Sequence, residues 1–379
     1  MKLKFIPSIR EVEAKAWNEC ANTDYPFLRH DFLLGLEDTG CTNANSGWQP
    51  HHCLLLDGDC LVGAIPSYLK SHSYGEYVFD WAFADAWQRS GLAYYPKLVS
   101  AIPFTPCSGP RILIHPQAAT PEVIAETLVQ GMQQEADEIA SSWHVLFHSD
   151  EDQSHFKSMG MHERQTCQFH WYNYGFSDFD DFLATFSSRK RKNLKKERAK
   201  VDQQNIQMKS IEGEAITPEV CQQFHRFYQI TYAKRSGHSG YLTQRFFTEL
   251  LPTLRDQVLL VFAYAENTPV AGALYFKDSN NLYGRYWGAL AEFDGLHFEA
   301  CYYQGIEYCI RKGLQHFDPG AQGEHKIQRG FEPIRTLSHH YICDKRFDEA
   351  VGRFCQEEVD HVRDYQVAAR DLLPFKQEG

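Results

Sequence analysis

The residues best suited to chemistry lie in one window, Gly313–Arg335, which reads GLQHFDPGAQGEHKIQRGFEPIR. Glycine has no Cβ, so its backbone can approach a bound ligand closely. Lys326 and Arg329 are cations beside these glycines and could polarise a ligand or bind its negative charge. Three further candidate contacts come from the same window: Gln322, Gly330 and Phe331.

A carboxylate that could accept a proton precedes this window. An amphipathic pattern predicts a helix over Leu296–Arg311, on which Glu299 shares a face with Tyr303, four residues later. We select Glu299 as the candidate general base and Tyr303 as a substrate contact. A structural role fits Glu299 nearly as well, because the helix dipole favours a glutamate near the N-terminus.

Further candidate contacts flank that helix. Arg285, Tyr286 and Trp287 follow each other on a predicted strand, so alternate side chains face opposite sides. An arginine with aromatic rings suits a substrate groove, although a packed strand whose arginine reaches solvent explains them equally well. His297 lies two residues before Glu299, on roughly the opposite face of the helix.

We expect no metal site. His297, Glu299, Glu324 and His325 offer the right atom types for a metal ion. Their spacing lacks the pattern of two histidines one helical turn apart that metal-binding helices use.

The most basic stretch is Ser187–Lys200, SSRKRKNLKKERAK, in a chain of formal net charge −11. A dense run of charge is usually a solvated face. This run opposes the sign of the whole chain, so it could also bind phosphate groups. It contains no aromatic residue, and base stacking is therefore not indicated.

Composition narrows the class of protein. A chain of 379 residues suggests two domains, and 43% hydrophobic with 23% charged residues is a normal globular balance. Because the net charge is negative, the surface as a whole does not favour binding to nucleic acid or to an anionic membrane. The 11 scattered cysteines include no C-x-x-C pair, which indicates reduced thiols in a cytoplasm. We expect no signal peptide and no membrane span.

Predicted elements follow from periodicity and turn residues. The turn at Asp57–Asp59 predicts a hairpin of His52–Asp57 with Leu61–Leu69. Other predicted strands and helices are Thr120–Ala140, Trp143–His148, Val220–Tyr232, Thr243–Leu254, Val258–Ala265, Val270–Lys277 and Ser338–Cys343.

The two halves of the chain share patterns in the same order. Val62–Lys70 (VGAIPSYLK) and Ala271–Lys277 (AGALYFK) each follow a hairpin turn, and Met159–Met161 after a strand echoes Gly330-Phe331. The spacing of Leu28, Phe32, Leu33 and Leu36 recurs at Leu242, Phe246, Phe247 and Leu250. We therefore expect a duplicated domain, with limits at 1–170 and 171–379.

Longer strings carry a family resemblance. In the second half these are YGRYWGA, LHFEACYYQGIEYCI and PGAQGEHKIQRGFEP; in the first, FLRHDFLLGLEDTGC and SHSYGEYVFDWAFADAW. They resemble the FemAB-like N-acyltransferases of bacteria, often labelled peptidoglycan biosynthesis or recognition proteins. The resemblance covers nearly the whole chain. It implies an α/β protein of two tandem GNAT-like (acyl-CoA N-acyltransferase) domains, with mixed sheets flanked by helices.

The resemblance also implies an activity. Fem-type relatives move an acyl or aminoacyl group from an activated donor to an amine, with a cell-wall precursor as one candidate acceptor. Acyl-CoA and aminoacyl-tRNA are the candidate donors, and no permanently bound cofactor is implied. Acetyl-CoA enzymes bind pyrophosphate on a glycine-rich loop at a helix N-terminus. Here that stretch has only Gly295 near the helix, which favours the tRNA-type donor.

The same resemblance suggests roles for individual residues. A lysine near the final strands stabilises charge in Fem-type relatives, and Lys326 looks like its counterpart, while Glu299 would take the proton of the amine. Basic residues follow the same helix in those relatives, so Arg189 and Lys192 are the expected contacts to tRNA or a nucleotide-linked acceptor. The first domain would hold the acceptor in a pocket lined by four residues: His72, Tyr74, Glu76 and Asp80.

A different class of function stays open, because a fold does not fix an activity. The chain could be a non-catalytic module that recognises a peptidoglycan-related or other ligand in a GNAT-like cleft. An enzyme requires an open channel to its catalytic groups, whereas a binding module could fill that channel with side chains.

The basic stretch generates the first testable prediction. Changing Arg189, Lys192 and Lys195 to Glu should weaken binding of a phosphorylated donor or acceptor without unfolding the protein, because so polar a run cannot be core. Binding by the unaltered protein should weaken as salt rises, since phosphate contacts release counterions. Titrations at several salt concentrations measure both effects. Equal affinity in the triple variant would make the stretch a plain solvated face.

Overall fold

The computed structural model describes residues 1–237, 239–321 and 323–376. They form two compact units, each made from two segments of the chain. Unit 1 comprises Met1–Cys167 and Arg335–Tyr365, and unit 2 comprises Gln168–Ile334 and the residues from Gln366 onward. The domain limits 1–170 and 171–379 stay a prediction, because a compact unit is not by itself a domain.

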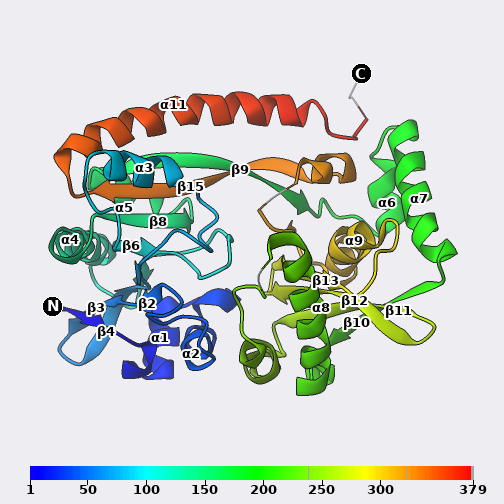
Figure 1. The fold of residues 1–379 in the computed structure, drawn as a ribbon, viewed down its shortest axis with the longest axis horizontal. Coiled ribbons are helices and arrows are strands. Elements are labelled where there is room, and N and C mark those ends of the chain that lie inside the picture. Colours follow the sequence, from blue (N-terminus) through cyan, green and yellow to red (C-terminus); the bar gives the residue numbers. More distant parts are fainter. Residues whose placement is uncertain (238, 322, 377–379) are drawn as a thin grey trace. The chain divides into compact units, whose positions relative to one another are not determined.

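Unit 1 contains two sheets (Figure 1). The smaller sheet has the order β1 (Lys2–Ile6), β3 (His52–Asp57), β4 (Cys60–Ile65), β7 (Leu113–Ile114). The larger has the order β9 (His162–Tyr172), β15 (Glu332–Ile342), β8 (Ser142–His148), β6 (Lys97–Ser100), β5 (Tyr68–Lys70), β2 (Trp48–Pro50). Its helical segments are η1 (Ile9–Glu11), α1 (Ala14–Ala21), η2 (Pro26–Leu28), α2 (His30–Asp38), α3 (Trp81–Arg89), α4 (Pro121–Ile139), α5 (Gln153–Ser158) and most of α11 (Lys345–Arg370).

The core of unit 1 forms where α4 meets strands of both sheets. Ile124, Leu128 and Met132 of α4 pack with residues such as Leu55 and Val145. The predicted hairpin is confirmed, but the single strand expected over Leu61–Leu69 is wrong. Pro66 has no N–H to donate, so β4 ends at Ile65 and the chain resumes as β5 in the other sheet.

Unit 2 is built on one sheet of order β10 (Ile206–Glu212), β11 (Val258–Ala265), β12 (Thr268–Lys277), β13 (Asn281–Ala289), β14 (His316–Asp318), β9. Its α-helices are α6 (Phe179–Ala184), α7 (Ser188–Gln203), α8 (Pro218–Ser236), α9 (Leu296–Phe298) and α10 (Gln304–Lys312). Its other helical segments are η3 (Gly213–Ala215), η4 (Phe246–Leu250), η5 (Leu251–Leu254), η6 (Glu299–Tyr303) and η7 (Glu324–Arg329).

Two helices of unit 2 differ from the predicted regular form. The expected helix Thr243–Leu254 is a π-turn, η4, followed by a 3₁₀ turn, η5, because Pro252 cannot donate the hydrogen bond that an α-helix needs. The expected helix Leu296–Arg311 runs through α9, η6 and α10, with η6 a π-turn. Such π-turns inside helices occur frequently at functional sites.

The two units share an order of strand pairing. In unit 1, β5 pairs antiparallel with β6, which pairs parallel with β8 after the α4 crossover. In unit 2, β12 pairs antiparallel with β13, which pairs parallel with β14 after the α9–α10 crossover. The two units then exchange their next strands. β9 follows β8 in the chain but pairs with β14, and β15 follows β14 in the chain but pairs with β8. The shared order is what a duplication predicts.

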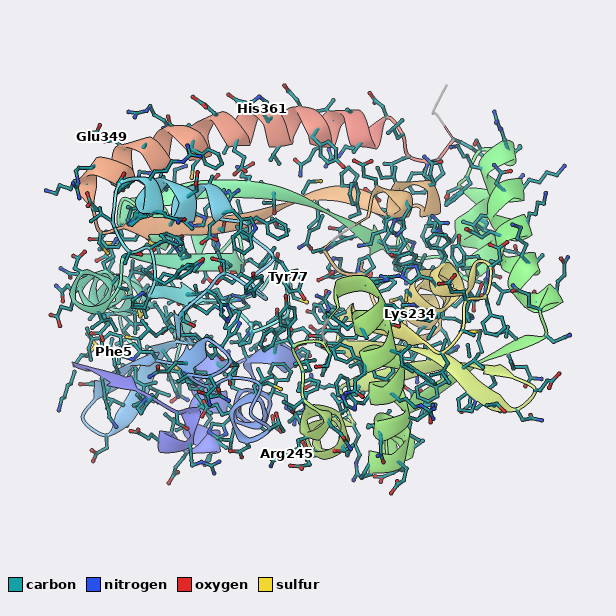
Figure 2. All side chains as sticks on the ribbon, in the orientation of Figure 1. Phe5, Tyr77, Lys234, Arg245, Glu349 and His361 are labelled. Atoms are coloured by element: carbon teal, nitrogen blue, oxygen red, sulfur yellow. The ribbon has the colours of Figure 1, made fainter. Side chains whose placement is uncertain are left out.

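The exposed residues of α8 and α11 include polar and charged side chains. Glu349 and His361 of α11 and Lys234 of α8 carry exposed side chains (Figure 2). Within the described ranges, no helix combines the length and the hydropathy that crossing a membrane requires.

Gly288 of β13 generates the second testable prediction. A Cβ on Gly288 would lie 2.2 Å from the carbonyl carbon of Phe227 in α8, whereas one on Gly160 would meet no atom within 4 Å. Gly288→Ala should cost about 3 kcal/mol in the free energy of unfolding, because backbone must move. Gly160→Ala should cost about 1 kcal/mol, from its positive φ alone. Urea unfolding of both variants measures the difference, and equal costs would contradict this packing.

Candidate functional site

The window Gly313–Arg335 is organised around Asp318, the last residue of β14. Its Oδ1 accepts hydrogen bonds from the guanidinium of Arg285 at 2.8 Å and from the backbone N–H of Gly320 at 2.8 Å. The side chains of Asp318 and Arg285 are 1% and 2% exposed. The carboxylate thus ties β13 to the turn after β14 and fixes the position of the Gly320 carbonyl.

Lys326 lies in η7 and donates to that carbonyl of Gly320. The residue is 1% exposed. Burial lowers the pKa of Lys326 to about 7, with Asp318 opposing the change and Arg285 adding to it. Near neutral pH the amine therefore exists both as a cation that can stabilise a developing oxyanion and as a neutral group.

Arg329 ends η7, and its guanidinium stacks on Phe298 with its carbon 3.5 Å from the ring centre. NH1 donates to the carbonyl of His325 at 2.6 Å, and NH2 contacts Glu197 Oε1 at 2.5 Å. Nε is buried and has no hydrogen-bond partner among the described residues. A groove of about 290 Å³ adjoins Arg329, lined by Lys190, Asn193, Leu194, Glu197, Tyr303, Gln328 and Arg329.

Glu299 is 4% exposed and lies in the π-turn η6. Arg198 of α7 donates to both of its oxygens, from Nε at 2.9 Å and from NH2 at 2.7 Å. Gln304 Nε2 adds a bond of 2.8 Å, and Arg198 NH1 also binds Glu307 at 2.6 Å. Both carboxylate oxygens are therefore occupied in this conformation.

Aromatic and histidine side chains line the same region of unit 2. The rings of Trp287 and His297 meet edge to face with centres 5.5 Å apart, and Tyr302 OH lies 2.8 Å from His325 Nε2. Burial lowers the pKa of His297 to about 3 and that of His325 to about 4, with nearby cations adding to both changes. Both imidazoles are neutral at pH 7. The hydroxyl of Tyr303 donates to Glu197.

The remaining predicted residues of the window and strand take structural positions. Phe331 is fully buried, with Tyr302 and Phe317 at ring distances of 5.4 and 5.6 Å. Gly330 has φ of 83°, and a Cβ there would meet Phe182 at 2.8 Å. The opposite side of β13 carries Tyr286, which packs on Tyr228 of α8 with ring centres 5.5 Å apart. Gln322 lies outside the described residues.

The basic stretch folds as α7, and part of it serves structural ion pairs. Lys195 pairs with Asp180 at 2.6 Å, Lys200 pairs with Asp294 at 2.8 Å, and Lys190 donates to Gln328. Arg189 and Lys192 are exposed, and no hydrogen bond or ion pair joins them to other described residues. These two cations are therefore available to a partner in solution.

The residues predicted in unit 1 surround a buried ionic network. Lys97 is fully buried and binds Glu76 at 2.7 Å as well as the carboxylate of Asp80, and Lys70 lies 3.7 Å from Glu76. Burial raises the pKa of Asp80, but Lys97, His144 and Ser73 together outweigh this effect and lower the pKa to about 2. Glu76 and Asp80 are 3% and 4% exposed. Both belong to the loop between β5 and α3, so their ion pairs anchor that loop.

The same loop between β5 and α3 carries His72 and Tyr74, the other two candidate contacts of unit 1. Tyr74 is 56% exposed, and its backbone carbonyl accepts from Trp48 Nε1 at 3.1 Å and Lys70 Nζ at 3.2 Å. A ring nitrogen of His72 lies 3.0 Å from the carbonyl of Ser46, and the rings of His72 and Tyr74 are 5.2 Å apart. The loop is therefore anchored while the Tyr74 ring faces solvent.

Sequence reasoning missed several residues that the geometry makes central: Asp318, Glu197, Arg198, Lys70 and Lys97. Asp318 had a readable signal, since an Asp before Pro-Gly at the end of a strand favours a turn that its own carboxylate caps. Glu197 and Arg198 gave none, because they stand in a run that reads as solvated charge. Among the residues that the structure describes, no group of three or more His, Cys, Asp or Glu side chains is arranged to hold a metal ion.

Comparison with known proteins identifies the family. The FemAB-like family, described as peptidoglycan biosynthesis/recognition, matches residues 8–377. The chain belongs to the FemAB-like family. A search of curated proteins gives no match to the sequence of this FemAB-like protein.

Solved structures show the fold of this FemAB-like protein. FemX has 10% identity, covers 93% of this chain and 100% of its own, and gives a TM-score of 0.54. The C-terminal DUF2156 domain of an Agrobacterium fabrum protein has 8% identity, covers 92% and 97% of the two chains, and gives 0.53. L-PGS from Bacillus licheniformis has 11% identity, covers 85% and 95%, and gives 0.50.

The expected fold class, an α/β protein with mixed sheets flanked by helices, is therefore confirmed. Family membership supports a role in peptidoglycan biosynthesis or recognition.

Lys97 generates the third testable prediction. Lys97→Met should lower the free energy of unfolding by about 3–5 kcal/mol, because it leaves Asp80 buried without its cation and Glu76 with only the more distant Lys70. Lys15→Met, which removes an exposed lysine, should leave unfolding nearly unchanged. Chemical denaturation compares them, and similar stabilities would show that the network is dispensable.

Proposed function

We propose that this FemAB-like protein is an N-acyltransferase. It moves an acyl or aminoacyl group from an activated donor, acyl-CoA or aminoacyl-tRNA, to the amine of a small-molecule acceptor, with a cell-wall precursor as the preferred candidate. The observation that supports this most is the buried amine of Lys326, held by the Gly320 carbonyl beside the parallel pair β13–β14.

The chemistry requires three things at one place. A neutral amine attacks the carbonyl carbon of the donor, a negative charge develops on the carbonyl oxygen, and the ester or thioester bond then breaks. Protonated Lys326 stabilises the developing charge. The attacking nitrogen loses one proton, and the leaving oxygen or sulfur gains one. Since both substrates are bound together, no covalent intermediate on the protein is needed.

Glu299 is the proposed acceptor of the amine proton. Both of its oxygens are bound by Arg198, so Arg198 has to release at least one of them before Glu299 can take a proton. The site therefore changes when substrate binds, and α7, which contributes Arg198, is the element that moves in this proposal.

Recognition of the substrates is assigned to the surrounding residues. Arg285, Trp287, His297 and Tyr303 are our candidate substrate contacts in unit 2. Arg329, with the exposed cations Arg189 and Lys192, would bind phosphates of tRNA or of a nucleotide-linked acceptor. In unit 1, His72, Tyr74, Glu76 and Asp80 stay our candidate acceptor contacts, of which Glu76 and Asp80 also pair with Lys97.

A specific observation favours a second function. The candidate catalytic groups already have internal partners: Glu299 binds Arg198, and Lys326 binds the Gly320 carbonyl. In a non-catalytic binding module, Glu299 and Lys326 would keep these internal partners at all times. Mass spectrometry of molecules retained by the purified protein, with acyl-CoA compounds and charged tRNA offered in parallel, separates the two. A retained ligand with no acylated product favours the binding module.

Lys326 generates the fourth testable prediction. Lys326→Ala should lower kcat by about 10²–10³-fold with a smaller change in KM, because a charge-stabilising donor acts mainly in the transition state. The control is Lys209→Ala, at an exposed lysine on β10 of the same unit, which should keep normal turnover. Full activity of Lys326→Ala on an identified substrate would remove Lys326 from the chemistry.

The pH dependence follows from the same group. The protonated form of Lys326 is lost as pH rises through its pKa of about 7, so this contribution to kcat should decline above neutrality. An arginine stays protonated, so Lys326→Arg should lose that alkaline decline while remaining slower, because its planar donors are placed differently.

A further inference from the structure

The groove beside Arg329 has an unused hydrogen-bonding edge. A guanidinium binds an oxyanion best with two parallel donors on one edge, as Arg does with phosphate. Arg329 is 9% exposed, and its Nε–NH2 edge is only half used, since NH2 binds Glu197 while Nε has no hydrogen-bond partner among the described residues. A buried donor without a partner costs free energy, and an anion that accepts from Nε would remove that cost.

Glu197 occupies the position that such a ligand would take. Its Oε1 contacts Arg329 NH2 at 2.5 Å, and its Oε2 accepts from Tyr303. Glu197 uses one oxygen for Arg329 and the other for Tyr303. It therefore binds NH2 of Arg329 but leaves Nε of the same edge without an acceptor among the described residues. The Glu197 side chain is 25% exposed, so it can leave for solvent at lower cost than a fully buried carboxylate could.

The rest of the groove suits an anion. Lys190, Asn193 and Gln328 line it with N–H donors, and Tyr303 adds a hydroxyl. With Glu197 in place the charged lining is Lys190, Arg329 and Glu197, which sums to one positive charge. A phosphate bears more negative charge than a carboxylate and offers several oxygens, so it can engage Nε and NH2 of Arg329 together with other donors of the lining.

We infer that this groove is a phosphate-binding subsite, and that Glu197 is an internal competitor that occupies Arg329 until the phosphate arrives. The inference rests on the proposed function only in taking the phosphate from the donor or the acceptor. It makes Glu197 a residue that sets affinity, because an intramolecular carboxylate lowers the apparent affinity of any anion that must displace it.

The direct test is isothermal titration with inorganic pyrophosphate. Glu197→Gln keeps the size of the side chain but removes its charge, so we expect pyrophosphate to bind about 5- to 10-fold more tightly than to the unaltered protein. Arg329→Lys keeps the charge but loses the bidentate edge, so we expect binding about 10-fold or more weaker. Thermal unfolding of each variant confirms that it is folded.

The matched control is Glu249→Gln. Glu249 is an exposed glutamate paired with Arg245 at 2.8 Å, so the substitution removes the same charge from a glutamate–arginine pair in the same unit. Its affinity for pyrophosphate should equal that of the unaltered protein. Three results would overturn the inference: no gain for Glu197→Gln over this control, full affinity in folded Arg329→Lys, or no binding of pyrophosphate to any variant.

Two further titrations identify the source of the phosphate. Coenzyme A represents the donor, and uridine diphosphate represents a nucleotide-linked acceptor. The compound whose binding is tightened by Glu197→Gln and weakened by Arg329→Lys supplies the phosphate of this groove. These measurements need no turnover, so the subsite can fail while Lys326 proves catalytic, and the reverse outcome is equally readable.

Discussion

A buried carboxylate has to be paired, and the candidate site of unit 2 depends on how Asp318 meets that requirement. Its partners are Arg285 from β13 and the backbone of Gly320. Each bond positions something else: Arg285 is held against β14, and the Gly320 carbonyl is turned towards Lys326. A single charge at the end of a three-residue strand therefore fixes a cation, a turn and an amine.

Unit 1 uses the same physical rule with different groups. There the buried charge is the ammonium of Lys97, and two carboxylates from one loop satisfy it. The network extends through Tyr94, whose hydroxyl donates to Asp80 at 2.6 Å and lies 3.0 Å from His144 Nε2. Buried ion pairs therefore anchor this loop, while the side chain of Tyr74 on the same loop is exposed to solvent. In both units, buried ion pairs thus fix the conformation of an irregular segment. Fixed segments of this kind are a common basis for ligand recognition.

Periodicity and turn chemistry predicted most strands and several helices, because these signals depend on neighbours in the chain. The window containing Lys326 was found for the same reason, since its glycines and charges are adjacent. The pairs that define the site are distant: Glu197 and Arg329 are 132 residues apart, and Arg198 and Glu299 are 101 apart. No local pattern distinguishes such a glutamate or arginine from a solvated one. Irregular backbone was missed where Pro66 and Pro252 override a periodic pattern.

The exchanged strands β9 and β15 bear on how the chain is made. β8 lies in the first half of the chain, but the strand that pairs with it in antiparallel register is β15, near the C-terminus. During synthesis from the N-terminus, the first half emerges with one edge of β8 lacking that neighbour. An open edge of this kind is a site for wrong pairing with other chains. Completion of unit 1 therefore waits for nearly the whole polypeptide, and a chaperone that shields a strand edge during translation would protect this interval.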